Sequence, residues 1–263
     1  MFFDTHTHLD YLQQTTGETL EKLVQNAQQA DVQKILIVAV SQQNFKIIEK
    51  ITALYPNQLY YGLGLHPLYI QQHTQQDLEQ LNRCLINRSA NLTSVAEIGL
   101  ERAIPALLTN ALWQKQGDFL DAQLQLAKQY DLPVNLHSRQ SHDQLYPFLK
   151  RIQLKECGVI HGFSGSYEQA KRFVDLGYKI GVGGTITYQR ANKTRQTIAK
   201  LPLDSLLLET DSPDMPVYGF QGQPNRPERV EQVFEHLCSL RKESPELIQY
   251  TIWQNSVKLF GHQ

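Results

Sequence analysis

Six side chains of the kinds that bind divalent metal ions lie far apart in the sequence, each beside a short apolar run. They are His6, His8, Glu97, His137, His161 and Asp211. Imidazole and carboxylate groups ligate zinc and other divalent ions, and four imidazoles with two carboxylates are more than one tetrahedral ion requires. The set therefore predicts a divalent-metal site, provided that the fold brings its members together.

The local setting of each candidate ligand favours this interpretation over a structural one. His6 and His8 are two residues apart in an expected extended segment, so their side chains point to the same side and can hold one ion. Glu97 interrupts an apolar run, and a carboxylate is rarely buried unless it is paired or bound to metal. The alternatives are core histidines bonded to backbone for the two later histidines, and a turn or helix-capping role for Asp211.

The elements that must position these side chains are eight short apolar runs, which are typical of buried parallel strands. They cover residues 2–3, 35–40, 60–65, 94–98, 134–136, 158–160, 179–182 and 206–208. The candidate ligands lie in these runs or at their carboxyl ends, from the first run to the last. Only closure of the sheet brings the first and last strands together, so the pattern predicts a TIM-type (β/α)8 barrel rather than an open doubly wound sheet.

Helical periodicity separates the strands, most clearly over residues 118–130, and a final helix is expected after Ser244 as N-cap with Pro245 at its first position. Residues 103–110 and 218–227 are expected to be long loops over the site. No composition break or linker divides the chain, so residues 1–263 are expected to form one domain.

The composition excludes several classes of protein. With 25 basic and 26 acidic side chains, the 263-residue chain has no general attraction for nucleic acid or membrane, so any phosphate binding must be local. Cys84, Cys157 and Cys238 are expected to be reduced and mostly buried. The absence of a leader or a long apolar run predicts a cytoplasmic protein, and no obligate protein partner is evident.

The segments DTHTHLD, GLGLHP, AEIGL, NLHSR, HGFSGS and LLETDSP, in this order over almost the whole chain, resemble the TatD family of metal-dependent hydrolases. The stretches GYKIGVGGTITY and GFQGQPNRPE are most similar to its bacterial YjjV branch. The resemblance implies a metallo-dependent hydrolase barrel of the amidohydrolase-like type, with two divalent cations per subunit: zinc, manganese or magnesium. It assigns His6, His8 and Asp211 to one ion, His137 and His161 to the other, and Glu97 to both.

The same resemblance implies hydrolysis of ester bonds, most simply by a phosphodiesterase or deoxyribonuclease acting on a small phosphodiester or a nucleic-acid end. Carboxylic-ester hydrolysis, such as that of aminoacyl esters, and amide hydrolysis are alternatives within the superfamily, and a non-catalytic metal-binding barrel is a more distant one. Asp211 is the expected general base for the attacking water. Glu101 and Arg102 depart from the family pattern of an Asp followed by an aromatic residue, which leaves substrate choice open.

Substrate contacts are expected from His66, Arg139, Asn225 and Arg226, with a structural turn, a surface ion pair and a helix cap as the alternatives. His142 is a weaker candidate of the same kind. Glu209 could orient a ligand histidine. Gly181, Gly183 and Gly184 are weaker candidates for a phosphate-binding loop, with tight packing of a turn as the alternative. His73, His236 and His262 are expected at surface or packing positions.

Overall fold

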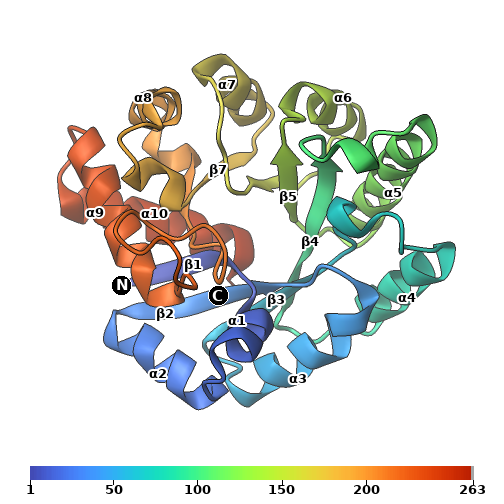
Figure 1. Ribbon diagram of the computed structural model, residues 1–263, viewed down its shortest axis with the longest axis horizontal. Coiled ribbons are helices and arrows are strands. Elements are labelled where there is room, and N and C mark those ends of the chain that lie inside the picture. Colours follow the sequence, from blue (N-terminus) through green and yellow to red (C-terminus); the bar gives the residue numbers. More distant parts are fainter. Residues whose placement is uncertain (262–263) are drawn as a thin grey trace.

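The chain folds into a nearly closed barrel of eight parallel strands, which confirms the expected architecture (Figure 1). The computed structural model describes residues 1–261. The strands follow one another around the sheet in sequence order. They are β1 (Phe2–Thr7), β2 (Val32–Val38), β3 (Leu59–Leu63), β4 (Leu92–Glu101), β5 (Val134–Arg139), β6 (Gly158–Ile160), β7 (Lys179–Val182) and β8 (Leu206–Leu208). Each expected apolar run overlaps one of these strands.

The barrel closes where β1 meets the segment that follows β8. Thr7 and Ser212 form a parallel bridge, the His8 amide donates to the Ser212 carbonyl at 2.7 Å, and the Asp211 amide donates to the His6 carbonyl at 2.9 Å. The backbone of the first and last candidate ligands is therefore joined directly across this seam.

Ten helices of the described chain surround the strands (Figure 1). They are α1 (Leu9–Thr16), α2 (Leu20–Gln29), α3 (Phe45–Leu54), α4 (Gln75–Ile86), α5 (Asn110–Gln129), α6 (His142–Ile152), α7 (Tyr167–Asp175), α8 (Asn192–Lys200), α9 (Val230–Leu240) and α10 (Pro245–Phe260). The Ser244 hydroxyl accepts from the Leu247 amide and so caps α10 as expected. Helix α5 begins earlier than its periodicity predicted, because Thr109 caps it and accepts from the Leu112 amide.

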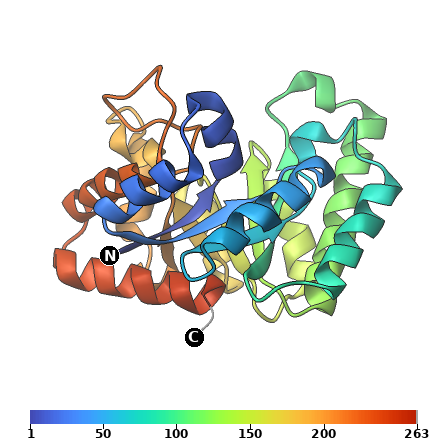
Figure 2. The ribbon, with the colours of Figure 1, turned by 90° about the horizontal axis from the view of Figure 1, so that it is seen from below.

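Two apolar layers hold the barrel together. Strand residues that face the helices form the larger core, whereas a smaller cluster inside the barrel includes Phe3, Leu36 and Leu207. Phe260 of α10 joins this inner cluster, so α10 covers the amino-terminal end of the barrel, and the loops after the strands lie at the other end (Figure 2). The barrel interior is thus filled by apolar side chains toward its amino-terminal end, and a functional site can form only at its carboxyl end.

Two local expectations need correction. The three cysteines are free, but they are half-buried rather than buried. Residues 103–110 form a shorter loop than expected, because Pro105–Leu107 form a 3-10 turn and Asn110 is already the first residue of α5. Among the described residues, no helix combines the length and apolar character that a membrane span requires.

Candidate metal centre

The six candidate ligands meet at the carboxyl end of the barrel, around the carboxylate of Glu97. The His161 Nε2 lies 2.8 Å and the His6 Nε2 3.5 Å from Glu97 Oε1. The His8 Nε2 lies 3.8 Å from the other oxygen, Oε2. The His137 Nδ1 is 4.0 Å from Oε1 and 3.3 Å from the His161 Nε2. Glu97 is therefore the centre of the cluster, with both oxygens facing imidazole nitrogens.

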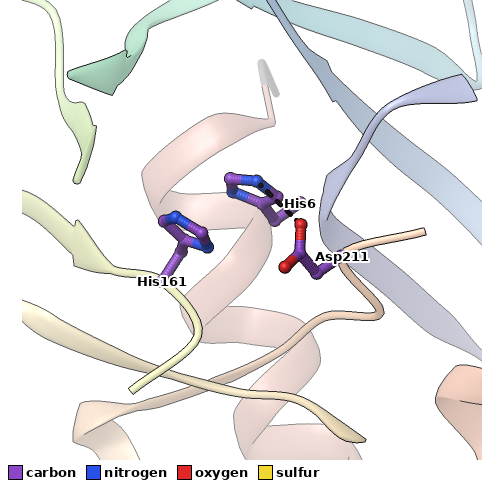
Figure 3. A group of neighbouring side chains, drawn as sticks. All are labelled: His6, His161 and Asp211. Carbon is purple, nitrogen blue, oxygen red and sulfur yellow. Dashed lines mark ion pairs between the residues drawn. The ribbon is translucent and has the colours of Figure 1, made fainter. Parts of the chain in front are cut away.

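Asp211 completes the cluster from the seam of the barrel. Its Oδ1 lies 3.5 Å from the His6 Nε2 and 3.6 Å from the His8 Nε2. The rings of His6 and His161 are stacked with centroids 3.8 Å apart, and Figure 3 shows these two rings and the Asp211 carboxylate gathered around a common space. The expected convergence of residues from the first and last strands is present in the fold.

Both carboxylates are presented by unusual backbone. Glu97 is the extra residue of a bulge in β4, because Ala96 pairs with Asn135 while Ile98 pairs with Leu136. Side chains alternate along a regular strand, so the bulge is what allows Glu97 to face the site directly after Ala96 of the inner cluster. Glu97 and Asp211 both have φ near +57°, a conformation that costs non-glycine residues energy and is concentrated at functional sites.

A fixed acceptor holds the first two imidazoles with the correct nitrogen free. The His6 Nδ1 lies 2.8 Å from Asn135 Oδ1, and the Asn135 amide nitrogen donates to the Thr5 carbonyl, so that oxygen faces the ring. The His8 Nδ1 lies 3.1 Å from the Val38 carbonyl. In each ring Nδ1 is bonded to the protein and Nε2 points into the cluster, which is the orientation that a metal ligand needs.

Glu101 has the same function for His137. Its Oε2 lies 3.2 Å from the His137 Nε2, which leaves the His137 Nδ1 facing the cluster, and its Oε1 accepts from the Ala103 amide. Glu101 is 1% exposed and is the last residue of β4. At the departure from the family pattern, Glu101 therefore supports a candidate ligand, whereas Arg102 is exposed.

His66 is oriented the opposite way. Its Nδ1 accepts a hydrogen bond from the Leu68 amide at 2.9 Å, so the ring proton is on Nε2, 3.0 Å from Glu97 Oε2. A protonated nitrogen is a donor and cannot ligate an ion. His66 is close enough to the cluster to be grouped with Glu97 and His137, yet its hydrogen bonds distinguish it from the four other imidazoles.

The cluster has the electrostatics of a cation site. The His6 Nε2 is buried and lacks a hydrogen-bond partner among the described residues. Burial lowers the pKa of His6 to about 3, so this ring is neutral and ready to ligate. Burial also opposes charge on His161, but the Glu97 and Asp211 carboxylates raise the pKa of His161 to about 9. The proton on His161 therefore occupies a position that a divalent cation would take, and the donor set fits such an ion.

The other expected substrate contacts, Arg139, Asn225 and Arg226, have different settings in the structure. Arg139 is 63% exposed at the rim, with its Nη1 3.9 Å from Glu101 Oε2. Asn225 is fully buried, and its amide nitrogen donates to the Thr210 carbonyl at 2.7 Å, so it shapes the loop after β8 rather than contacting substrate. Arg226 pairs with Glu18 and Glu228, which ties that loop to the segment between α1 and α2 and leaves its charge neutralised.

The weaker candidates also have structural explanations. A Cβ at Gly181 would lie 2.2 Å from Glu209 Oε2, and one at Gly184 2.5 Å from the Met215 carbonyl, so close packing accounts for these glycines. Glu209 is fully buried and accepts from the Gly162 amide, next to His161, rather than from an imidazole. Both ring nitrogens of His142 are hydrogen-bonded, to the Ser138 hydroxyl and the Ser164 carbonyl.

The other histidines differ in setting. The buried His73 donates to the His66 carbonyl at 2.9 Å, which confirms a packing position, and His236 is partly buried on α9. His262 lies outside the described residues. Sequence reasoning missed Asn135, although a polar residue inside the apolar run of β5 was a usable signal.

Comparison with known proteins agrees with the fold and the site. A family model described as TatD related DNase matches residues 3–261. An uncharacterized metal-dependent hydrolase of Haemophilus influenzae is 68% identical over 99% of both chains. The uncharacterized metal-dependent hydrolase YjjV of Escherichia coli is 51% identical over 99% of this chain and 98% of that protein. The crystal structure of E. coli YjjV covers 100% of this chain and 98% of its own, with a TM-score of 0.93.

A parallel barrel with buried imidazoles and carboxylates at its carboxyl end is the architecture of metal-dependent hydrolases. The more distant structure of a TatD family hydrolase from Entamoeba histolytica, 20% identical with a TM-score of 0.85, shares this fold. The extent of the family match and the identities to its relatives show that the chain belongs to the TatD family of metal-dependent hydrolases.

Proposed function

We propose that the chain is a divalent-metal-dependent phosphodiesterase that acts on a small phosphodiester or a nucleic-acid end. The observation that carries this proposal is the central position of Glu97, whose carboxylate lies within 4.0 Å of an imidazole nitrogen from both groups of candidate ligands, His6 and His8 on one side and His137 and His161 on the other. A carboxylate so placed can bridge two ions, which is the arrangement used by many phosphodiester hydrolases. The family model's description as a TatD related DNase supports the same substrate class.

In this proposal two groups of side chains hold two ions, with Glu97 shared between them. His6, His8 and Asp211 hold one ion, and His137 and His161 hold the other. Bound divalent ions would lower the pKa of water and neutralise charge on a phosphoryl oxygen. The imidazole-rich set favours zinc or manganese, and the carboxylates also tolerate magnesium.

Asp211 is the proposed proton acceptor for the attacking water. Burial alone would raise its pKa, but the neighbouring imidazoles of His8, His6 and His161 hold the pKa of Asp211 below its usual value. Its carboxylate is thus ionised at neutral pH, and its side chain is 17% exposed, so water can reach it. Both properties are required of a general base.

Two further groups are proposed to contact the phosphate. The Nε2 proton of His66 points into the cluster, which makes this ring a hydrogen-bond donor for a phosphoryl oxygen. Arg139 adds an exposed positive charge at the rim, and a guanidinium group suits a phosphate in charge and in shape. Neither residue is needed to hold an ion, so both are available for substrate.

A substrate panel tests the proposal. Metal-depleted protein is loaded separately with zinc, manganese or magnesium and assayed on bis(p-nitrophenyl) phosphate, a short oligodeoxynucleotide, p-nitrophenyl acetate, an aminoacyl ester and a cyclic amide. We expect the highest kcat/KM on a phosphodiester. Asp211→Asn should lose that activity, whereas Asp175→Asn, which changes an exposed carboxylate on α7, should keep it. Faster Asp211-dependent turnover of the carboxylic ester or the amide would refute phosphodiester hydrolysis as the function.

A further inference from the structure

A cleft of about 440 Å³ lies between the segment after β7, the loop after β8 and helix α9. Its lining includes Tyr188, Arg190, Arg195, Tyr218 and His236. A cleft of this size is within the range that accommodates small organic ligands. Its lining contains no acidic side chain, in a chain whose charges otherwise nearly balance.

The cleft is firmly built into the carboxyl end of the barrel. The Tyr218 amide donates to the Thr187 hydroxyl at 2.8 Å, and the Tyr188 hydroxyl donates to the Pro216 carbonyl at 2.7 Å. These bonds join the two loops that form its walls. Figure 2 shows the loop after β8 at the opposite end of the barrel from α10.

The length of the connecting chain limits the distance between the cleft and the proposed site of hydrolysis. Only seven residues of chain lead from Asp211 to Tyr218, and an extended chain of that length spans at most about 25 Å. A substrate strand of several units bound at the metal centre is long enough to span that distance.

Two side chains of the cleft are free to bind. Tyr218 is 65% exposed, and its ring meets that of Tyr188 edge-on, with centroids 5.8 Å apart and an interplanar angle of 87°. Arg190 is exposed, lies 5.0 Å from the Tyr188 ring, and has no carboxylate partner within residues 1–261. An open aromatic face beside an unpaired guanidinium group is the combination by which proteins hold single-stranded nucleic acid.

We propose that this cleft binds one nucleotide of a single-stranded nucleic acid, with its base stacked on Tyr218 and its phosphate held by Arg190. The inference rests on the proposed phosphodiesterase function and specifies its substrate as a strand rather than a small diester. Tyr188 acts as a positioning residue, because its hydroxyl is bonded to the opposite wall and its ring supports Arg190. The cleft contacts the strand some nucleotides away from the bond that is hydrolysed.

Binding is measured by fluorescence anisotropy on the full chain, with a labelled oligothymidylate and a matching oligouridylate, in chelator so that neither is cleaved. Tyr218→Ala should weaken binding about tenfold, and Tyr218→Phe should restore it, because stacking needs only the ring. Arg190→Gln should weaken binding and reduce the slope of log K against log salt by about 0.7, the value for one phosphate contact on a single strand. Tyr218→Ala should leave that slope unchanged.

Matched controls lie away from the cleft. Tyr250→Ala removes a tyrosine that is 64% exposed on α10, and Arg83→Gln removes an exposed arginine on α4. Neither should change oligonucleotide binding. In metal-loaded protein, all these variants should hydrolyse bis(p-nitrophenyl) phosphate at the parental rate, because that diester is too small to occupy both sites.

The outcomes separate the two proposals. Parental oligonucleotide affinity in both Tyr218→Ala and Arg190→Gln overturns the cleft while hydrolysis of the small diester still supports the function. Loss of oligonucleotide affinity in these variants, with no phosphodiester hydrolysed by the loaded parent, supports the cleft and overturns the function. An equal loss in Tyr250→Ala would also count against the cleft, because it would show that binding is not local to it.

Discussion

Replacing Glu101 by Gln tests whether the hydrogen bond behind His137 maintains the metal centre. The two oxygens of Glu101 accept from two different donors, the His137 Nε2 at 3.2 Å and the Ala103 amide at 2.6 Å. A Gln side chain has one oxygen and one NH2 group, so it can accept from only one of these donors and must oppose the other with a donor of its own. Since Glu101 is 1% exposed, water cannot fully replace the lost partner.

The expected loss of metal affinity follows from that unsatisfied donor. An unsatisfied buried polar group costs about 1–3 kcal/mol, and loss of a partner behind a ligand histidine typically lowers metal affinity about 10–100-fold. The two ranges agree, because a tenfold change in affinity corresponds to about 1.4 kcal/mol. Glu101→Asp should also weaken binding, since one methylene fewer prevents the carboxylate from reaching both donors.

The assay is a titration of metal-free protein with zinc in competition with a chromophoric chelator, alongside circular dichroism. Asp175→Asn serves as the control, because Asp175 is an exposed carboxylate that pairs with Lys171 on the surface of α7. We expect its zinc affinity to match the parent. A folded Glu101→Gln protein that binds zinc within about threefold of the parent, a difference below about 1 kcal/mol, would show that this hydrogen bond does not support the site.

The remaining predictions concern the reaction and the fold. Asp211→Asn with full metal occupancy should lower kcat by more than tenfold, or over about 1.4 kcal/mol, while changing KM little, and parental turnover would end its assignment as the base. Glu97→Gln should lose metal first, by elemental analysis, and added metal should recover part of its rate. Chelation should abolish activity without loss of the helical circular dichroism signal, because two apolar cores hold the barrel; unfolding on chelation would contradict this. Gly181→Ala should lower the free energy of unfolding by about 1–3 kcal/mol, since its Cβ would lie 2.2 Å from a buried carboxylate oxygen. Gly117→Ala in α5, whose Cβ has only a 3.4 Å contact, should be neutral or stabilising by up to about 1 kcal/mol, as denaturant titration would show.

The barrel and the cluster could be predicted because their signals are local. Buried parallel strands are continuous apolar runs, so each could be found alone, and a ligand at the carboxyl end of a run is placed by the barrel's symmetry. The run that ends at Ile160 and is followed by His161 is an example. Such placement needs no knowledge of the loops.

The supporting contacts depended on segments far apart in the chain and could not be predicted in this way. The β4 bulge that turns Glu97 inward is defined only by its pairing with β5. The partner of the His137 ring, Glu101, is 36 residues away, and that of the His6 ring, Asn135, is 129 away. Likewise, the burial of Asn225 follows from how its loop folds back on Thr210, which periodicity cannot reveal.

The seam between β1 and the end of β8 has a consequence for biosynthesis. His6 leaves the ribosome almost at once, yet its backbone partner, Asp211, is 205 residues behind it. At about 5–20 residues per second, the interval is roughly 10–40 s, during which the first imidazoles have no carboxylate from the far side of the seam. A nascent chain that ends before Asp211 therefore lacks one of the candidate ligands, and the complete cluster can form only after Asp211 has been synthesised.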